Sequence, residues 1–476
     1  MKKTLLLATS LFVVSSIFSQ YATGDNTSEE EFEKILKAAE RATRDLTNLP
    51  TSFSIKKYAP IPQNQGIYGT CVAWSSAYAA RTISYAIKRN LTNADSLTKY
   101  AFSPGYIYYK IKDAGDDDCK KGSSILTAMT VMTSDGAMLK KEGLVDCTLN
   151  IPENEATKKA APYKIKTFLS LVQKRDSITK NEIIKIKKSL SEKKPVVFSL
   201  KIDDRFEKLP ETGFWSPEDD FIPAGRHAMC IIGYDDKIAG GAFEVINSWS
   251  TNWGNKGFFW ISYKQMMKYG SYAVELMDYE IGKTTISGDI EFVKLSDTGT
   301  DISLGATRKK MTAANTVVKG TQKIDYSLYK LTETLKGGDQ FKMKFSTNTP
   351  SFIYVFAEDD KEKISRLFPY PANISAAINQ PNATYYLPSE FDHARLDMAP
   401  GKENFCILYS KSEIDLEGLL TYINDTKINL YQAVKNKLGT RLVDQKKVKF
   451  TDDRISFEVP TDDKSILCFF VEMNHK

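Results

Sequence analysis

The chain has 476 residues and a formal net charge of +6 at pH 7, and its basic and acidic residues are interspersed. Interspersed charge argues against nucleic acid or an anionic surface as the main partner. At about 100–200 residues per domain, the length favours two or three domains. Six cysteines are too few for a disulfide scaffold, and no HExxH, CxxC or His-rich cluster indicates a zinc enzyme. We therefore expect neither a metal nor a cofactor.

The first residues have the pattern of a secretory signal peptide. "MKKT" is a short basic start, Leu5–Phe18 is an apolar run, and Ser19 is a small residue suited to cleavage. The run is shorter than the roughly 20 apolar residues that a membrane span needs. We expect residues 1–19 to be removed, no membrane span, and a protein that is secreted, periplasmic or at the cell surface.

The next segment, "NTSEEEFEKILKAAERATRDLTN" (residues 26–48), predicts one charged amphipathic helix. Polar capping residues precede acidic residues in the first turn, and basic residues follow later. We interpret residues 20–48 as an N-terminal helical arm or a short prosegment, with docking as an arm the favoured alternative.

Helical patterns continue over residues 71–90, 125–136 and 180–194, and a strand pattern follows at 195–202. Short strands with turns between them then run to about residue 282. Helices first and a sheet second is the order of an α+β domain, which we place at residues 49–282.

The remaining chain divides into two predicted parts. Residues 283–325 are polar and weakly patterned, so we expect a linker or loosely docked strands there. Residues 326–476 alternate as strands around a helical pair at 414–438, which predicts a mostly β, sandwich-like domain. This domain shows no catalytic constellation. Its tyrosine-rich strands favour binding to a cell-surface or protein partner, and we interpret His393 as a surface histidine.

Three residues of the α+β domain form a candidate catalytic set. Cys71 lies where a helix begins, and the helix N-terminus stabilises a thiolate, which is the nucleophilic form. His227 starts a strand, and Asn247 follows twenty residues later on the next strand. A cysteine nucleophile needs an imidazole to move its proton and a third group to orient that ring.

Two segments around these residues resemble a known family. "NQGIYGTCVAW" and "NSWSTNWGNKGFFWISY" are similar to the cysteine and asparagine segments of papain- and cathepsin-like cysteine peptidases, and "LPTSFSIKKYAPIPQNQG" is similar to the start of exported bacterial members. The resemblance implies two lobes, one helical from Cys71 onward and one a β lobe with His227 and Asn247. Protein or peptide substrate would lie in the cleft between them.

The resemblance also implies residue roles. Cys71 is the nucleophile, His227 the general base and acid, and Asn247 the residue that orients the ring. Trp249 shields the histidine–asparagine hydrogen bond and is also a candidate substrate-binding residue. Gln65 supplies an oxyanion-hole N–H together with the backbone of Cys71. In "CKKGSSI", Gly122 and Ser123 match a segment whose backbone binds substrate, although a helix-entry turn explains them equally well.

Four positions depart from the family pattern. Val72 replaces the usual aromatic residue after the nucleophile, and Tyr68 replaces a cysteine. Ser250 stands where a glycine is usual, and Arg226 places a cation next to His227, where it disfavours imidazolium.

The resemblance favours a secreted cysteine endopeptidase acting through a thioester on Cys71. The alternatives are a non-catalytic surface binding protein on the same scaffold and a Cys/His peptidoglycan hydrolase. Among the other cysteines, we expect a Cys119–Cys147 disulfide, a buried free thiol at Cys230, and reduced Cys406 and Cys468 unless neighbouring strands pair them.

Overall fold

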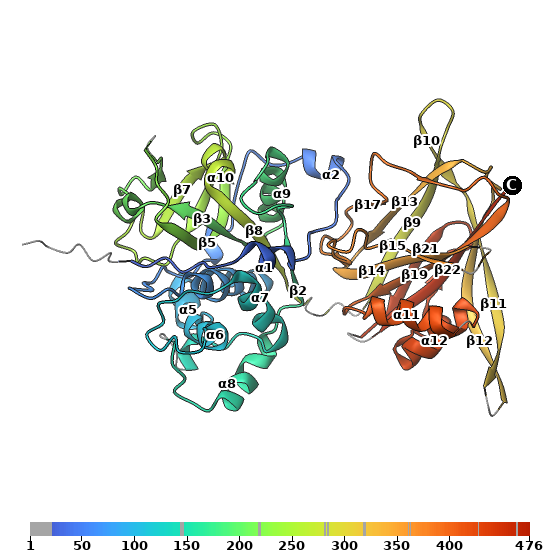
Figure 1. Ribbon diagram of the computed structural model, residues 1–476, viewed down its shortest axis with the longest axis horizontal. Coiled ribbons are helices and arrows are strands. Elements are labelled where there is room, and N and C mark those ends of the chain that lie inside the picture. Colours follow the sequence, from blue (N-terminus) through green and yellow to red (C-terminus); the bar gives the residue numbers. More distant parts are fainter. Residues whose placement is uncertain are drawn as a thin grey trace, which may run out of the picture.

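The computed structural model describes residues 21–476 apart from residues 143–146, 218–219, 280–281, 283–284, 318–319, 360, 362, 427 and 463–464. The expected signal peptide lies outside the described residues. Two bodies of structure follow one another along the chain, and an N-terminal arm runs between them (Figure 1). Within the described residues, no helix has the length and apolar character to cross a membrane.

The arm, residues 21–48, is not the continuous helix that its charge pattern predicts. Only α1 (Glu29–Glu33) and α2 (Arg44–Thr47) are helical. Ser28 and Glu31 form the expected capping box, but the chain is extended after α1. There the backbone of Lys37 and Ala38 bonds to Ser170 on one side and to residues 373–375 on the other. Backbone partners outside the arm replace the helical hydrogen bonds.

The helical lobe begins at the expected position. α3 (Cys71–Ala73), a π-helical stretch (Trp74–Arg81) and α4 (Thr82–Arg89) form one rod that ends at Asn90. Asn90 has a φ of 52°, the left-handed conformation that closes many helices. The other helices of this lobe are α5 (Ala94–Lys99), α6 (Pro104–Ile111), α7 (Ile125–Ser134) and α8 (Glu153–Ala160).

The β lobe is one sheet in the order β2-β8-β3-β5-β6-β7-β4, with β1 paired to β5. Its strands are β1 (Ser52–Ser54), β2 (Thr167–Ser170), β3 (Val196–Ile202), β4 (Phe214–Trp215), β5 (Gly225–Asp235), β6 (Ala242–Ile246), β7 (Phe258–Ser262) and β8 (Gly270–Met277), with helices α9 (Lys180–Ser191) and α10 (Tyr263–Tyr269). The strand β5 lies over the start of the Cys71 helix, so one hydrophobic core joins the two lobes.

The C-terminal body is the expected sandwich. One sheet has the order β17-β13-β9-β21-β20, with β10 paired to β9 and β18 paired to β13, and the other has the order β11-β12-β22-β19-β14-β15, with β16 on β14. Apolar residues of both sheets fill the space between them. Helices α11 (Leu416–Thr426) and α12 (Leu430–Leu438) cover the outer face of the second sheet, as the helical pair predicts. The α+β fold class and the β-rich C-terminal region are thus confirmed.

The strands of the sandwich are β9 (Thr285–Leu295), β10 (Asp301–Leu304), β11 (Ala306–Val317), β12 (Gly320–Leu331), β13 (Gln340–Thr347), β14 (Ser351–Glu358), β15 (Ile364–Phe368), β16 (Ala377–Ile378), β17 (Tyr385–Leu387), β18 (Ala394–Arg395), β19 (Gly401–Ser410), β20 (Lys449–Phe450), β21 (Ile455–Pro460) and β22 (Ile466–His475). Short 3₁₀ turns occur at Lys56–Tyr58, Lys140–Glu142, Ala161–Tyr163, Asp204–Lys208, Gly439–Arg441 and Gln445–Lys447.

The segment 283–325 is not a loose linker over its described residues. β9 is a central strand that pairs with β13 on one side and β21 on the other. Its residues Ile286, Ile290 and Phe292 are buried in the sandwich core. Alternate burial along a strand that also carries polar residues explains why the sequence pattern is weak.

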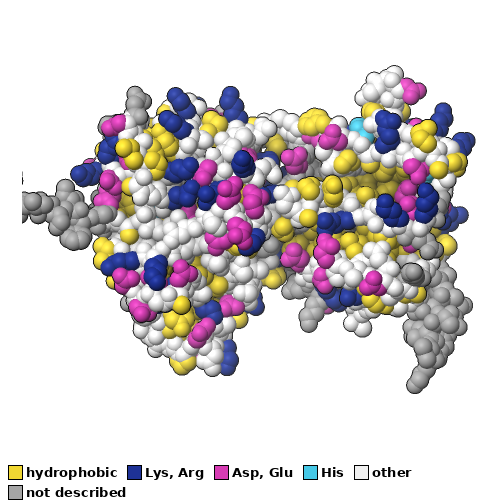
Figure 2. Space-filling model, viewed as in Figure 1, with side chains coloured by type: hydrophobic (Ala, Val, Ile, Leu, Met, Phe, Trp, Pro, Cys, Tyr) yellow, Lys and Arg dark blue, Asp and Glu magenta, His cyan; other side chains and the backbone are white. Residues whose placement is uncertain are grey.

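The two bodies also share apolar packing. Leu169 of β2 and Met277 of β8 belong to the same buried cluster as Leu328 and Phe352 of the sandwich. Basic and acidic side chains alternate over both bodies on the face in Figure 2. The surface therefore keeps the mixed charge seen in the sequence.

Candidate active site

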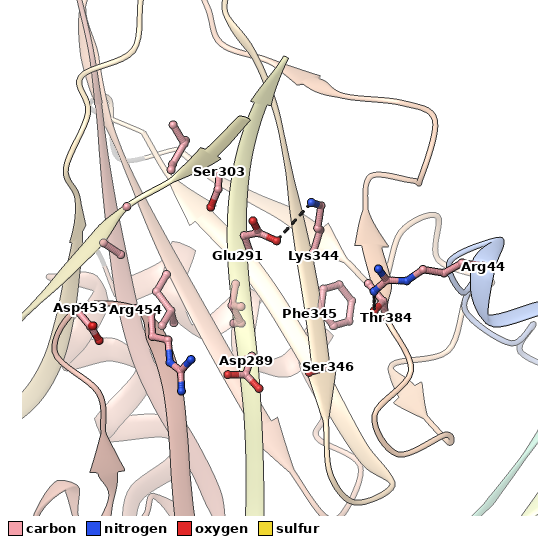
Figure 3. Close-up of a pocket in the computed structure, with 15 residues that line it drawn as sticks. Arg44, Asp289, Glu291, Ser303, Lys344, Phe345, Ser346, Thr384, Asp453 and Arg454 are labelled. Carbon is pink, nitrogen blue, oxygen red and sulfur yellow. Dashed lines mark hydrogen bonds and ion pairs between the residues drawn. The ribbon is translucent and has the colours of Figure 1, made fainter. Parts of the chain in front are cut away.

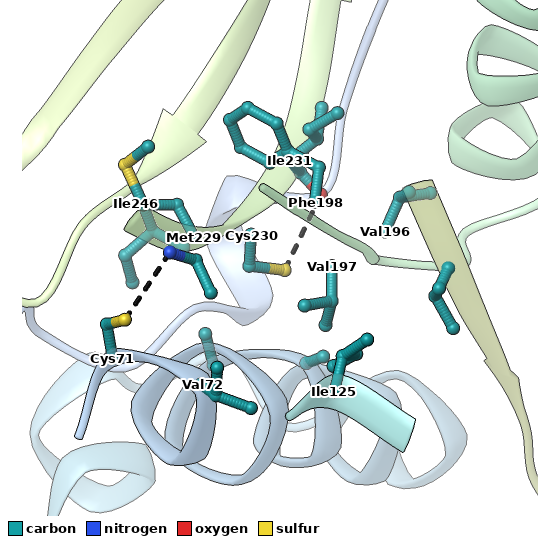
Figure 4. Packing of buried hydrophobic residues seen from close by; sticks show 14 of the residues in the cluster. Cys71, Val72, Ile125, Val196, Val197, Phe198, Met229, Cys230, Ile231 and Ile246 are labelled. Carbon is teal, nitrogen blue, oxygen red and sulfur yellow. Dashed lines mark hydrogen bonds between the residues drawn. The ribbon is translucent and has the colours of Figure 1, made fainter. Parts of the chain in front are cut away.

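Cys71 is the first residue of α3 and is completely buried. Its Sγ accepts a hydrogen bond from the backbone N–H of Ala228, 3.5 Å away on β5. Figure 4 shows Cys71 at the start of the helix, facing the strands, with Val72 and Ile125 in the apolar layer behind it. The predicted nucleophile therefore lies beside the strand that carries the predicted histidine.

His227 and Asn247 are in direct contact. His227 lies on β5, Asn247 follows β6 directly, and β5 pairs with β6. The distance from His227 Nε2 to Asn247 Oδ1 is 2.7 Å. The backbone N–H of Ser248 donates to the same Oδ1 at 2.8 Å, so this atom is the amide oxygen. His227 Nε2 must then carry the hydrogen.

The other ring nitrogen of His227 is consequently the proton acceptor. Nδ1 is buried and has no hydrogen-bond partner among the described residues. A neutral imidazole with its hydrogen on Nε2 has a lone pair on Nδ1. Nδ1 is therefore free to receive a proton from a neighbouring thiol.

Trp249 covers this pair from one side. Its ring stacks on the His227 ring with centroids 4.6 Å apart and an interplanar angle of 29°. Phe206 packs on Trp249 in turn, with centroids 5.3 Å apart. Trp249 is buried against the His227 ring, a position compatible with the shielding role that the resemblance implies.

Gln65 is held by a residue that the sequence did not single out. Ser248 Oγ donates to Gln65 Oε1 at 2.6 Å, and the backbone N–H of Gln65 donates to the Ser248 carbonyl at 2.8 Å. Two carbonyl oxygens, which only accept, face the other end of the Gln65 amide, so that end is the nitrogen. Nε2 then donates to the carbonyl oxygens of Ala22, at 3.0 Å, and of Tyr68, at 2.9 Å.

Gly122 and Ser123 lie against the arm. The N–H of Ser123 donates to the Gly24 carbonyl at 2.9 Å, and the N–H of Asn26 donates to the Ser123 carbonyl at 3.0 Å. Gly122 has a φ of +83°, and a Cβ there would lie 2.6 Å from the Gly24 oxygen. Glycine therefore allows a peptide backbone to approach this edge closely.

The arm tip, which we define as residues 21–27, thus lies across the predicted site. Tyr21 stacks on Trp249 with centroids 4.8 Å apart, Ala22 accepts from Gln65, and Asp25 is buried next to Ser199. The sequence "YATGDNT" carries no pattern that predicts this position. Each of these contacts joins residues far apart in the chain, so no local sequence pattern could indicate where the arm tip lies.

Burial sets the protonation of the covered site. Burial raises the pKa of Cys71 to about 12, with Asp25 adding to the rise and the N–H groups of Ala228 and Gly24 opposing it. Burial also lowers the pKa of His227 to about 4, against the hydrogen bond with Asn247. The expected thiolate therefore does not form while the arm is docked, because desolvation outweighs the helix N-terminus.

The departures from the family pattern have local explanations. Ser250 adopts a φ of +67°, a conformation that glycine reaches most easily. The Arg226 guanidinium lies 3.0 Å from the Asp176 carboxylate and donates to Ser271 Oγ, so its charge is balanced by Asp176.

The cysteines outside the site behave as follows. Cys119 and Cys147 form the expected disulfide, and Cys230 is a buried free thiol, as expected. Cys406 and Cys468 are free, with their Sγ atoms 3.9 Å apart on the paired strands β19 and β22. His393 is not a plain surface residue, because its Nε2 lies 2.8 Å from Asp301 Oδ1.

Within the described residues, no group of three or more His, Cys, Asp or Glu side chains is arranged to hold a metal ion. A cavity of about 370 Å³ lies on the sandwich beside the arm (Figure 3). Its lining includes Arg44, which donates to Thr384, and the paired Glu291 and Lys344, and contains none of the three catalytic candidates.

Comparisons with known proteins agree with this geometry. Residues 49–277 match the papain family cysteine protease family, and residues 334–413 match the Domain of unknown function (DUF4384). An uncharacterized peptidase C1-like protein of Acanthamoeba polyphaga mimivirus is 26% identical over 227 residues, which cover 44% of this chain and 69% of that protein.

Among solved structures, xylellain, a cysteine protease from Xylella fastidiosa, is 19% identical with a TM-score of 0.44, covering 55% of this chain and 97% of its own. A recombinant stem bromelain precursor is 18% identical with a TM-score of 0.41, covering 54% of this chain and 78% of its own. By the family match and the recurrence of its motifs at one site, residues 49–277 belong to the papain family, and the chain is a papain-like cysteine peptidase with a C-terminal domain of unknown function.

Proposed function

We propose that the protein is a secreted endopeptidase that cleaves peptide bonds through a thioester acyl-enzyme on Cys71. The observation that carries the proposal is the 2.7 Å contact between His227 Nε2 and Asn247, which leaves Nδ1 as the free base beside the helix that starts at Cys71. Export rests on the signal-peptide pattern of residues 1–19.

The proposed reaction begins from a neutral thiol and a neutral imidazole. His227 Nδ1 takes the Cys71 proton as Sγ attacks the substrate carbonyl carbon. The carbonyl oxygen becomes an oxyanion that accepts from Gln65 Nε2 and the backbone N–H of Cys71. His227 then gives the proton to the leaving amine as the C–N bond breaks, and a water molecule hydrolyses the thioester by the same route.

We further infer that the arm tip holds the enzyme in a latent state. The Ala22 carbonyl occupies the side-chain donor of Gln65, which the oxyanion needs. The Gly24 backbone N–H lies at the Cys71 sulfur, where it lowers the thiol pKa. An N–H group is not an electrophile, so this contact gives the sulfur nothing to attack. The N-terminal segment acts in this proposal as a short prosegment and not only as a docked arm.

The C-terminal domain contributes to this latency by holding a second part of the arm. This part, which we call the clamp segment, comprises residues 36–46. Arg41 Nη1 lies 2.5 Å from Glu192, which follows α9, and Arg41 Nη2 donates to Asn379 of the sandwich at 3.2 Å. The N–H of Ala42 donates to the Thr384 carbonyl at 2.9 Å. The clamp segment therefore bridges the two domains.

Substitution of Gly24 in the arm tip tests whether the protein is a latent endopeptidase. A Cβ at Gly24 would overlap the backbone of Gly69, so Gly24→Val should displace the tip. We expect this variant to hydrolyse denatured casein, with Glu29→Val, an exposed change on the same arm, as the matched control. Activity should vanish in Gly24→Val/Cys71→Ala.

The alternatives make different predictions in the same assay. A non-catalytic binding protein would leave casein intact in Gly24→Val even though a thiol reagent reaches Cys71. A peptidoglycan hydrolase would solubilise purified cell-wall sacculi and leave casein intact. Either result would overturn the endopeptidase proposal.

A further inference from the structure

A buried polar pocket lies beside Cys71 and is occupied by Asp25 of the arm tip. Ser199 is completely buried in β3, a strand whose other residues are mostly apolar. Its Oγ donates to Asp25 Oδ2. A hydroxyl in such a strand is costly unless it is hydrogen-bonded, and the arm tip supplies its partner.

Sheet register places this hydroxyl next to the catalytic residues. β3 lies between β5 and β8, where Ser199 pairs with Ala228 on one side and with Tyr272 on the other. Directly paired residues present their side chains on the same face of a sheet. Ser199 and Tyr272 therefore share a face, and Asp25, which bonds to Ser199 and lies near Tyr272, is also close enough to Cys71 to raise the pKa of its thiol.

Tyr272 completes the pocket. The side chain is fully buried, and its hydroxyl lies near the Asp25 carboxyl and Thr27, although the geometry with the described residues falls short of a hydrogen bond. The ring stacks on Phe32 of α1 with centroids 6.4 Å apart. A buried hydroxyl without a well-formed partner is available to a group that enters from the cleft.

The contacts of the Asp25 carboxyl describe what this pocket accepts. Oδ2 accepts from Ser199 of the pocket, whereas Oδ1 accepts from Thr27 Oγ1 at 2.6 Å and from the Thr27 N–H at 3.1 Å, both within the arm tip itself. The pocket therefore meets this carboxyl with the hydroxyls of Ser199 and Tyr272, and no cation among the described residues pairs with it. Burial accordingly raises the pKa of Asp25 and favours the neutral acid, while Cys71 and Tyr272, the titratable groups that face it, are also kept neutral by burial.

We propose that Ser199 and Tyr272 determine the substrate specificity of this peptidase by selecting a short amide side chain, that of asparagine. Aspartate is the second choice. The selected residue is the one whose backbone pairs with Ser123, because Asp25 is flanked by the two residues that bond to Ser123. The inference rests on the proposed peptidase function. A carboxamide both donates and accepts, which suits hydroxyl partners without a counter-ion.

The test uses the full-length Gly24→Val protein and a positional library of internally quenched peptides containing Asn, Asp, Leu or Arg. At one position, we expect Asn to be cleaved at least about tenfold faster than Leu at pH 7.5, with Asp approaching Asn at pH 5. Ser199→Val should invert the order of Asn and Leu, and Tyr272→Phe, which removes only the hydroxyl, should slow Asn peptides without slowing Leu peptides. A preference for Leu that Ser199→Val leaves unchanged would overturn the proposal.

A second measurement does not depend on hydrolysis. Residue 25 of the arm tip occupies the pocket, so its binding can be followed through the protection of Cys71. In the full-length protein at pH 7.5, Cys71 should be alkylated by iodoacetamide at least about tenfold faster in Asp25→Leu than in Asp25→Asn. Equal protection in both variants would contradict selection by the pocket. Cys71 could be protected from alkylation in Asp25→Asn but not in Asp25→Leu while Gly24→Val cleaves no peptide of the library. That result would support selection of an amide by the pocket and would count against the proposed peptidase function.

Discussion

The two stretches of the N-terminal arm are held in different ways. The arm tip reaches the cleft through backbone hydrogen bonds, the stacked ring of Tyr21 and the buried carboxyl of Asp25, whose pKa burial raises. The clamp segment pairs with both domains and carries the buried Arg41–Glu192 ion pair. The tip therefore opens at lower cost than the clamp segment, since it separates no buried pair of charges. Opening of the site should release the tip and leave the clamp segment in place.

The largest expected effect is on peptide hydrolysis at the site that the arm tip covers. In the Gly24→Val background, Cys71→Ala should lower peptide hydrolysis by about 10⁶-fold, the scale of loss when a protease nucleophile is removed. The rate of cleavage of a quenched peptide measures it. His227→Ala should approach the same loss, and Asn247→Ala should lose less because it removes only the orienting contact. Hydrolysis that survives Cys71→Ala would assign the chemistry to another residue.

Gln65 tests the role of the arm tip more finely. Its Nε2 bonds to the arm tip in the latent state and is proposed to bond to the oxyanion in the active state. In the Gly24→Val background, Gln65→Ala should lower kcat by roughly 10²–10³-fold with little change in KM, as for other oxyanion donors. Steady-state kinetics separate the two constants. A change in KM alone would show that Gln65 binds substrate and does not stabilise the transition state.

For the clamp segment, we expect substitutions to change the stability of the protein. Arg41→Ala should lower the free energy of unfolding by about 2 kcal/mol, less than the ~3–5 kcal/mol of a fully uncompensated buried charge. Glu192 keeps partial compensation from Lys188 and Lys194. Denaturant unfolding measures the loss, and Lys34→Ala, an exposed arm residue, is the control. An unchanged midpoint would mean that the clamp segment adds nothing to domain association.

The smallest expected effect is on pH dependence. A docked carboxyl with a raised pKa holds its proton more tightly than a solvated one, so docking of the tip is favoured below the ordinary value of 3.8 and weakens as the pH rises through the docked pKa. Alkylation of Cys71, taken as the ratio of wild type to Asp25→Asn, should rise a few-fold from pH 4 to pH 7. The ratio removes the titration of His227, which both proteins share. A ratio that does not change with pH would show that titration of Asp25 does not control docking of the arm tip.

The sequence predicted most of the elements that carry the candidate catalytic residues, because each of these residues lies in a local motif. Cys71 begins the expected helix and His227 lies on the expected strand, while Asn247 comes directly after the next strand and not on it. Ser248 lies inside the same motif, but its bond to Gln65 joins residues 183 positions apart, and no local pattern shows that.

The arm was predicted poorly for a physical reason. Its charge pattern is that of a helix, yet Lys37 and Ala38 find backbone partners in both domains, and these replace helical hydrogen bonds. The Ser199–Asp25 contact spans 174 positions. In both cases tertiary contacts decide the outcome, and local propensity does not.

The rate at which iodoacetamide alkylates Cys71, followed by mass spectrometry at pH 7.5, tests the latent state most directly. We expect slow labelling in the full-length protein and in Glu29→Val, and labelling at least about a hundredfold faster in Gly24→Val, since the tip no longer covers the sulfur. Equally fast labelling of Cys71 in all three proteins would contradict the account, because the arm tip would then not close the site.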